Sequence, residues 1–322
     1  DYSLLDANFK SNDQFLAVNF LENENRSEYS IDFVNLSLKN ITNPKNKIFF
    51  EGLVNGKIEL IKKGNLYEGK SSLTLNDLSA NSNKIGDATL KIDASKDLKS
   101  FVMDFDIEKD ENKILSLNGN FGIEKDFFPL DLQLNMYGFS IMPFSKIGDN
   151  VITDFRGKFD SSVKISGNTN DPVFAGIISN NNVEFKIPYL NVDYRLANNP
   201  SFQLSNQSFK IKDFELSHSK SKSTGKLNGL ITHNKFKEWF LDLNISSNNL
   251  QILETNSENQ NLYYGNAFLN GFANINGPGE RLSVEIVGST NNGTYITIPL
   301  SDSKNTGDLS YLSFNKKNER IN

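Results

Sequence analysis

The chain has 322 residues, a net charge of −5 and a pI near 5.3, and it contains no cysteine. The absence of cysteine excludes a disulfide framework and a thiolate metal site. Acidic and basic residues are interspersed, without the basic stripe that nucleic-acid binding needs. Only 37% of the residues are hydrophobic, below the usual share for a compact globule, yet 25 residues are phenylalanine. The apolar content is therefore carried by large side chains.

Alternation of apolar and polar residues runs along almost the whole chain. In the segment LDLQLNM, residues 130–136, four apolar side chains alternate with Asp131, Gln133 and Asn135. A period of two is typical of a β-strand with one apolar face. The pattern recurs, in chain order, at residues 31–33, 101–107, 163–165, 183–187, 202–204, 209–211, 214–216, 282–286 and 296–300.

The connecting segments are rich in Asn, Gly, Ser and Asp, as is usual for turns. The segments SNNN (179–182) and TNNG (290–293) predict tight hairpin turns, and Pro188 predicts a strand corner. Residues 141–155 fit a short helix or a loop, and residues 249–262 are a second helix candidate. The sequence predicts an all-β fold: an elongated antiparallel β-groove, taco-shaped or solenoid-like, with a hydrophobic concave interior and few short helices.

The second half of the chain repeats itself. Residues 117–134 match residues 227–245, and residues 165–190 match residues 275–300. The matched pairs are 110 or 111 residues apart, for example Gly119 and Gly229 (229 − 119 = 110). We expect one continuous elongated structure made of an N-terminal β-rich segment (1–116), a first β-module (117–226) and a second β-module (227–322) that is truncated at its C-terminus.

Residues that could carry chemistry are few. His218 and His233 are the only histidines, and neither has a companion at metal-binding spacing, so both are predicted to be isolated surface or turn residues. The carboxylates Asp104 and Asp106 alternate with apolar residues, which favours the solvent face of a strand over a glycosidase pair. No G-x-S-x-G nucleophile motif occurs. The sequence predicts a protein that is not an enzyme and that holds no metal or cofactor.

The glycines and prolines of the two modules follow a fixed order. The string Gly167, Asp171–Pro172, Gly176, Pro188, Gly225 and Gly229 is followed by Tyr264–Gly265, Gly271, Gly277–Pro278, Gly293–Thr294 and Pro299. Over residues 117–314 this order resembles the TamB family, the translocation and assembly module subunit of Gram-negative envelopes, whose AsmA-like members are repeating β-groove lipid-transfer proteins.

The resemblance implies a periplasmic protein that is anchored in the inner membrane by an N-terminal helix. It implies a β-taco with a hydrophobic groove that carries phospholipid between the two membranes. It also implies a role in outer membrane biogenesis and protein secretion with an Omp85-type outer-membrane barrel partner. We expect the anchor helix and the partner-binding C-terminal part to lie outside this sequence.

The alternating strands lead to a similar expectation without the resemblance. Roughly twenty strands stacked at ~4.8 Å would form a rod of ~95 Å with one apolar face. That face must close on itself or hold something apolar, because each large side chain left in water forgoes ~1.5–3 kcal/mol. The predicted lining residues are Phe101, Met103, Phe105, Leu130, Leu132, Leu134, Val163, Ile165, Val183, Phe185, Leu241, Leu243, Ile245, Leu282, Val284, Ile296 and Ile298.

Three functions fit the sequence. The first is a lipid conduit in which phospholipid acyl chains lie in the groove. The second is a scaffold or chaperone for outer-membrane barrels, in which exposed strand edges pair with nascent strands. The third is a surface adhesin or glycan-binding β-solenoid, for which calcium-binding Asp/Gly loops are expected, and the sequence lacks them.

Overall fold

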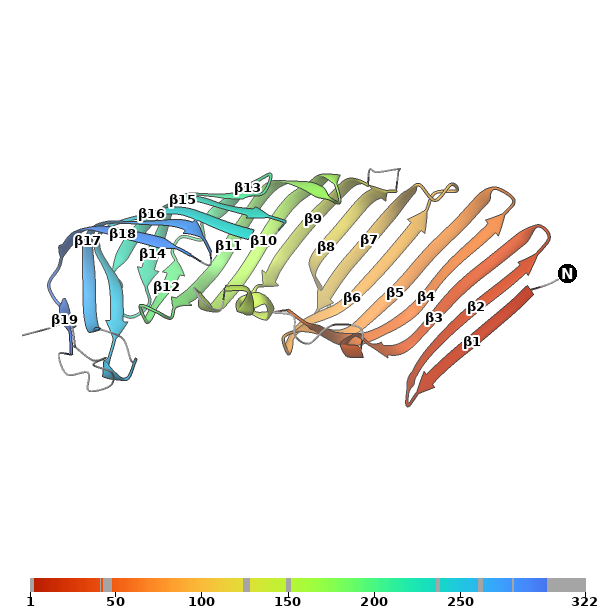
Figure 1. Ribbon diagram of the computed structural model, residues 1–322, viewed down its shortest axis with the longest axis horizontal. Helices are drawn as coiled ribbons and strands as arrows, with labels where there is room; N and C mark the ends of the chain where they lie inside the picture. Colours follow the sequence, from red (N-terminus) through yellow and green to blue (C-terminus); the bar gives the residue numbers. More distant parts are fainter. Residues whose placement is uncertain are drawn as a thin grey trace, which may run out of the picture.

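The computed structural model of the chain is one antiparallel sheet of 19 strands (Figure 1). The structure describes residues 3–40, 42, 48–123, 128–148, 152–235, 238–259, 263–279 and 281–299. Within these residues, the helical elements are three short 3₁₀ helices. The predicted all-β, elongated antiparallel fold is confirmed.

The strands follow one another across the sheet in chain order. The first half contains β1 (Ser3–Ser11), β2 (Gln14–Asn23), β3 (Arg26–Ser37), β4 (Phe50–Lys63), β5 (Leu66–Ala80), β6 (Asn83–Ala94), β7 (Ser100–Lys109), β8 (Asn112–Gly122) and β9 (Pro129–Ser140). The second half contains β10 (Thr153–Asn168), β11 (Asp171–Ile187), β12 (Val192–Leu196), β13 (Ser201–Ser205), β14 (Ser208–His218), β15 (Thr224–Asn234), β16 (Glu238–Thr255), β17 (Tyr264–Pro278), β18 (Ser283–Thr290) and β19 (Tyr295–Thr297). The 3₁₀ helices are η1 (Leu38–Asn40), η2 (Met142–Gly148) and η3 (Ser257–Asn259).

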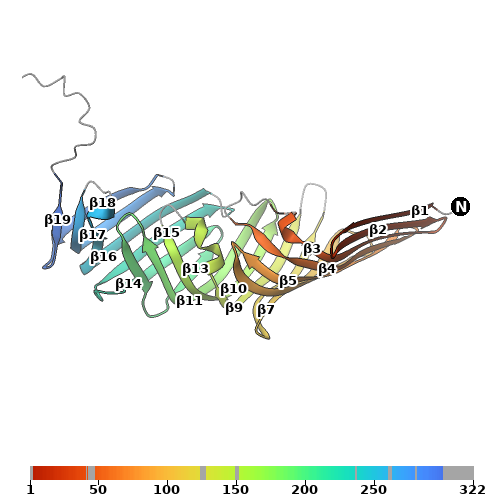
Figure 2. The same ribbon diagram turned by 90° about the horizontal axis from the view of Figure 1, so that it is seen from below.

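The sheet is long and narrow. β12 and β13 share one rung because both pair with β11 and with β14, and β18 and β19 both pair with β17. The 19 strands therefore occupy 19 − 2 = 17 rungs. The 17 − 1 = 16 spacings of ~4.8 Å give a length of about 77 Å. Seen from below, the first strands form a nearly flat layer, whereas the later strands curve into a gutter (Figure 2).

The strand register places apolar residues opposite apolar residues. Leu132 of β9 lies opposite Gly119 of β8 and Ile165 of β10, and Leu134 lies opposite Leu117 and Val163. Directly opposed residues in an antiparallel pair point to the same face, and neighbours along a strand point to opposite faces. Leu132 and Leu134 therefore lie on one face of the sheet, and Asp131 and Gln133 lie on the other.

Four bulges bend the strands toward one rim of the sheet. Asn35, Asp77, Asn182 and Asp213 have φ angles of 52°, 54°, 53° and 54°, and the register shifts at each of them. Asn and Asp tolerate this left-handed conformation better than most residues, and a bulge bends a strand locally. Each backbone N–H donates to a side-chain oxygen nearby, at 2.7–3.0 Å; the acceptors are Asn55, Asp87, Asn199 and Asn228, respectively.

The two sequence modules pair in the same way. Gly119 of β8 lies opposite Leu132 of β9, and Gly229 of β15 lies opposite Leu243 of β16. Both glycines have a φ of +140°, and a Cβ atom at either would lie 2.1 Å from a carbonyl oxygen of the next strand. The module boundaries at 116/117 and 226/227 fall inside β8 and β15. We therefore propose the modules as repeats within one continuous sheet.

Alanine at position 229 should be strongly destabilising. The new Cβ atom must fit against a backbone oxygen, and the φ of +140° is one that only glycine adopts readily. We expect Gly229→Ala to lower the free energy of unfolding by about 3 kcal/mol or more in urea titrations. Gly64→Ala is the control, because Gly64 lies in a turn with a φ of +57° and open space around it, and we expect a loss of about 1 kcal/mol there. Equal losses at the two positions would contradict this account.

Three local predictions were wrong. Residues 179–182 lie inside β11 rather than in a hairpin turn, because the Asn-rich stretch forms the bulge at Asn182. Residues 249–255 belong to β16, so in the described part of the second helix candidate only η3 is helical; residues 260–262 lie outside the described residues. Residues 290–293 connect β18 to β19, but both strands pair with β17 along one rung, so this segment is not a hairpin turn either. The corner after residue 187 is confirmed, and residues 142–148 form η2.

Candidate functional site

The candidate site is the apolar face of the sheet, which we call the trough. Its floor in the middle of the sheet includes Phe101, Met103 and Phe105 of β7, which lie opposite β8 residues that in turn face the leucines of β9. The rings of Phe101 and Phe121 stack with their centroids 5.0 Å apart. Large side chains on successive rungs thus form one continuous apolar surface.

The apolar face continues without a break to the first strand. Leu5 of β1 lies opposite Phe20 of β2, Phe20 lies opposite Tyr29 of β3, and the rings of Phe20 and Tyr29 are 4.7 Å apart. This end of the trough is open. The buried hydrophobic residues described in β1–β4 are only Ala17 and Val54, whereas Leu5 is 57% exposed. The N-terminal rungs therefore offer an uncovered apolar surface.

The trough is closed over most of β10–β17. The largest buried cluster includes Val183, Val192, Phe214 and Leu250, all between 0% and 2% exposed. The ring of Phe202 in β13 meets the ring of Phe214 in β14 edge-on at 4.8 Å. These side chains come from strand segments before and after the bulges at Asn182 and Asp213. The segments after the bulges therefore pack over the segments before them. The closed part resembles the core of a β-sandwich.

The last rungs are open again. All residues of β18 are exposed, including Val284 and Ile286, which lie opposite Ile275 and Ala273 on the trough face of β17. Ile296 of β19 lies opposite Gly265 and is also exposed. The trough thus has an open segment at each end and a closed segment between them.

The register and the packing place most of the predicted lining residues together. The members in β7, β9, β10, β16 and β18 share the trough face through their cross-strand partners, and Val183 and Phe185 pack in the closed cluster. Leu282 precedes β18 and Ile298 follows β19, so both lie outside the strands. That these residues hold a ligand stays a prediction.

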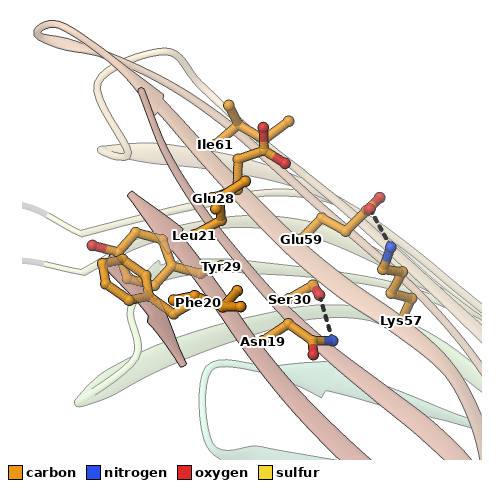
Figure 3. A pocket seen from close by; sticks show the side chains of 10 residues that line it. Asn19, Phe20, Leu21, Glu28, Tyr29, Ser30, Lys57, Glu59 and Ile61 are labelled. Atoms are coloured by element: carbon orange, nitrogen blue, oxygen red, sulfur yellow. Dashed lines mark hydrogen bonds and ion pairs between the residues drawn. The ribbon is translucent and has the colours of Figure 1, made fainter. Parts of the chain in front are cut away.

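A small pocket lies in the open N-terminal part (Figure 3). Its volume is about 120 Å³, below the ~300–1,000 Å³ typical of small-molecule sites. The wall includes an ion pair of 2.6 Å between Lys57 and Glu59 and a hydrogen bond of 3.4 Å from Asn19 to Ser30. These four residues lie on the polar face of the sheet, whereas Phe20 and Tyr29, which also line the pocket, belong to the trough face.

The carboxylates that could have formed a catalytic pair lie on the solvent face. Asp106 pairs with Lys113 at 2.7 Å, and Asp131 pairs with Lys164. Asp104 and Asp242 are exposed. Within the described ranges, no group of three or more metal-ligating side chains comes together. These carboxylates therefore hydrate the solvent face of the sheet.

The prediction for the two histidines was wrong, because both are buried. Nδ1 of His218 is 2.9 Å from Oγ of Ser221, and its Nε2 is 3.5 Å from Oε2 of Glu254. The ring of His233 packs 5.0 Å from that of Trp239 and 5.5 Å from that of Phe209. Each histidine is a core residue on the apolar face of its strand, and for His233 the nearby Trp239 in the sequence could have indicated burial.

Burial lowers the pKa of His218 and of His233 below the usual 6.5; for His218, Glu254 opposes the effect of burial. Near pH 6.5 the two histidines of the unfolded chain therefore bind protons, whereas those of the folded chain remain neutral. We expect the free energy of unfolding to fall as the pH drops below 6.5, by up to about 1.4 kcal/mol per pH unit for each histidine, and to level off below the folded pKa values.

Urea titrations at pH 7.5 and 5.5 measure this effect. The chain has only two histidines, so the double variant His218→Gln, His233→Gln should lose the pH dependence in this range. An unchanged pH dependence in the double variant would assign it to other groups.

A single antiparallel sheet with an apolar face from its first rung to its last defines an elongated β-groove protein. Residues 207–321 match the family model of the TamB C-terminal domain. This match confirms, over the C-terminal part of the chain, the resemblance to the TamB family. The family is associated with the cell envelope and with transport and assembly.

Further comparisons add no relatives. No curated protein and no solved structure matches the chain. In the part of the chain that the structure describes, no helix is both long enough and apolar enough to cross a membrane.

Proposed function

We propose that the chain is a section of a periplasmic bridge-like lipid-transfer protein that carries phospholipid acyl chains along the trough between the inner and outer membranes. The observation that carries this proposal is the unbroken apolar face that strand register creates from β1 to β18. Its open ends expose large side chains such as Phe9, at 62%, and Val284, at 57%. Acyl chains are the ligands that match such a long, apolar surface, while their headgroups remain in water.

The proposal is tested by photocrosslinking in the full-length protein. Benzoylphenylalanine at Phe101, on the trough face, should crosslink to phospholipid in living cells. Tyr137 is the matched control, because it is an exposed aromatic residue of β9 next to Met136 and points to the solvent face. Lipid adducts at position 101 and not at 137 are the expected result. Equal labelling, or no lipid at 101, would refute the conduit.

The second candidate is a scaffold for outer-membrane barrels that pairs with nascent strands through a sheet edge, together with an Omp85-type partner. Among the described residues, β1 pairs with β2 alone, and its sequence SLLDANFKS contains no proline and one lysine. Native edges are usually protected by such residues or by bulges, so a strand of this composition is suited to strand addition wherever its outer side is unpaired. Ala7→Pro should impair barrel assembly without affecting lipid adducts at position 101, whereas unimpaired assembly would count against the scaffold.

A further inference from the structure

The connection between β11 and β12 lies across a neighbouring hairpin. Residues 189–194, which we call the strap, follow the end of β11 and contact the last residues of β16. Leu190 accepts a hydrogen bond at its backbone oxygen from the backbone N–H of Glu254, at 3.0 Å, and Nδ2 of Asn191 donates to the backbone oxygen of Glu254, at 2.5 Å. The hydroxyl of Tyr194 donates to the backbone oxygen of Gln251, at 2.7 Å.

These contacts are additional to the pairing of the sheet. β12 pairs with β11 and β14, and β16 pairs with β15 and β17, so the strap reaches past the β14–β15 hairpin to join strands that are not neighbours. The joined residues are 57 to 64 positions apart in the chain (254 − 190 = 64). The strap therefore closes the rim of the trough from above.

The underside of the strap is apolar. Val192 is fully buried, Tyr194 and Leu250 are nearly so, and all three belong to the closed cluster. The pKa of the Tyr194 hydroxyl is raised by burial. Three hydrogen bonds between described residues join the strap to β16, and the rest of its hold is the pairing of β12, just five residues long, with β11 and β14. Short segments with few ladder bonds open more readily than the rest of a sheet.

We propose that the strap is a gate over the closed segment of the trough, which opens to let an acyl chain pass between the two open ends. This inference rests on the proposed lipid-transfer function. It adds where the trough is gated, at its closed segment, and which segment of the chain moves, the strap. When the strap lifts, the side chains beneath it face the trough, and an acyl chain replaces the contacts that they lose. The ligand then favours the open state because it binds that state alone.

The motion itself is measured first, in the lipid-free protein. Amide hydrogen exchange at Glu254 reports the opening, because its N–H donates to Leu190 in the strap. The N–H groups of the β16–β17 ladder, at Ile245 for example, serve as the reference. We expect faster exchange at Glu254, and Tyr194→Phe, which removes one latch bond and keeps the ring, should accelerate it about 2- to 12-fold. Exchange at Glu254 as slow as in the ladder, in both proteins, would overturn the gate.

The passage of lipid is measured with a closed strap. The chain has no cysteine, so Asn191→Cys with Glu254→Cys forms a single staple from the strap to β16, either as a disulfide or through a short bismaleimide. Benzoylphenylalanine replaces Phe185, which lies opposite Tyr194 of the strap and packs against the closed cluster, or Phe101, in the open half. The probe is a vesicle of phosphatidylethanolamine and phosphatidylglycerol. Gln133→Cys with Lys164→Cys is the control, because these residues lie opposite each other on the solvent face.

The two positions separate the possible failures. We expect the staple to abolish lipid adducts at position 185 and to preserve them at 101, reduction of the disulfide to restore them, and the control staple to change neither. Equal adducts at position 185 with and without the staple would overturn the gate and leave the conduit standing. Missing adducts at both positions in the unstapled protein would overturn the conduit, and the gate with it.

Discussion

Phe214→Asp is expected to unfold the second half of the sheet. Phe214 is 2% exposed and lies at the centre of the closed cluster, with its ring against that of Phe202. Removal of a buried phenylalanine alone costs about 3–5 kcal/mol, and an unpaired carboxylate in its place adds the penalty for a buried charge. The sum approaches the whole stability of a typical domain, about 5–15 kcal/mol.

Circular dichroism melting and limited proteolysis of the purified chain check this expectation. Lys212→Asp places the same new carboxylate two residues away in β14, where the side chain is exposed, and should melt close to the wild-type temperature. If Phe214→Asp melted like the control, the second half of the trough would be open to water and the closed cluster would be wrong. The strap would then have nothing to cover.

The alternation of residues was enough to predict the strands and their two faces. Leu132 and Asp131 could be assigned to opposite faces because neighbours on a strand must diverge, whatever the sheet does next. The matched glycines 119 and 229 predicted a repeat, and their identical pairing follows from the same close approach of two backbones. These features depend on local geometry, which a sequence carries.

The closure of the trough depends on where each strand bends, and that signal was weaker. Phe209 and Ile211 alternate, and the next buried pair, Phe214 and Leu216, is out of step by one residue. This slip marks the bulge at Asp213, which turns the rim over the floor. The slip was visible in the sequence, but its consequence requires knowing which strands lie beside it.

Long-range contacts could not be predicted at all. The strap meets β16 through backbone oxygens and through side chains such as Asn191 that have no distinctive sequence context. The burial of His218 likewise depends on Tyr194 and Glu254, which are 24 and 36 residues away (218 − 194 = 24 and 254 − 218 = 36). Neither pattern has a fixed spacing, because the partners come from different rungs.

Ile58→Asp should block lipid movement while the protein remains folded. Ile58 lies on the trough face of β4, opposite Ile31 of β3, and is 36% exposed. A carboxylate there reaches water when the trough is empty, so we expect a loss of stability of about 1 kcal/mol. An acyl chain in the trough would remove that water, and burial of an unpaired charge is strongly unfavourable. Photocrosslinking of lipid from position 101 in cells should therefore fall about tenfold or more.

Ser72→Asp is the matched control for the charge. Ser72 lies one residue beyond Ser71, the direct partner of Ile58, and is exposed on the opposite face beside Lys57. The same carboxylate on the solvent face should leave both melting temperature and lipid adducts unchanged, since it never meets the acyl chain. Wild-type adduct yields in Ile58→Asp would show that lipid reaches position 101 without passing β4. Loss of adducts in both variants would instead point to net charge, because both proteins gain one carboxylate but carry it on opposite faces of the sheet.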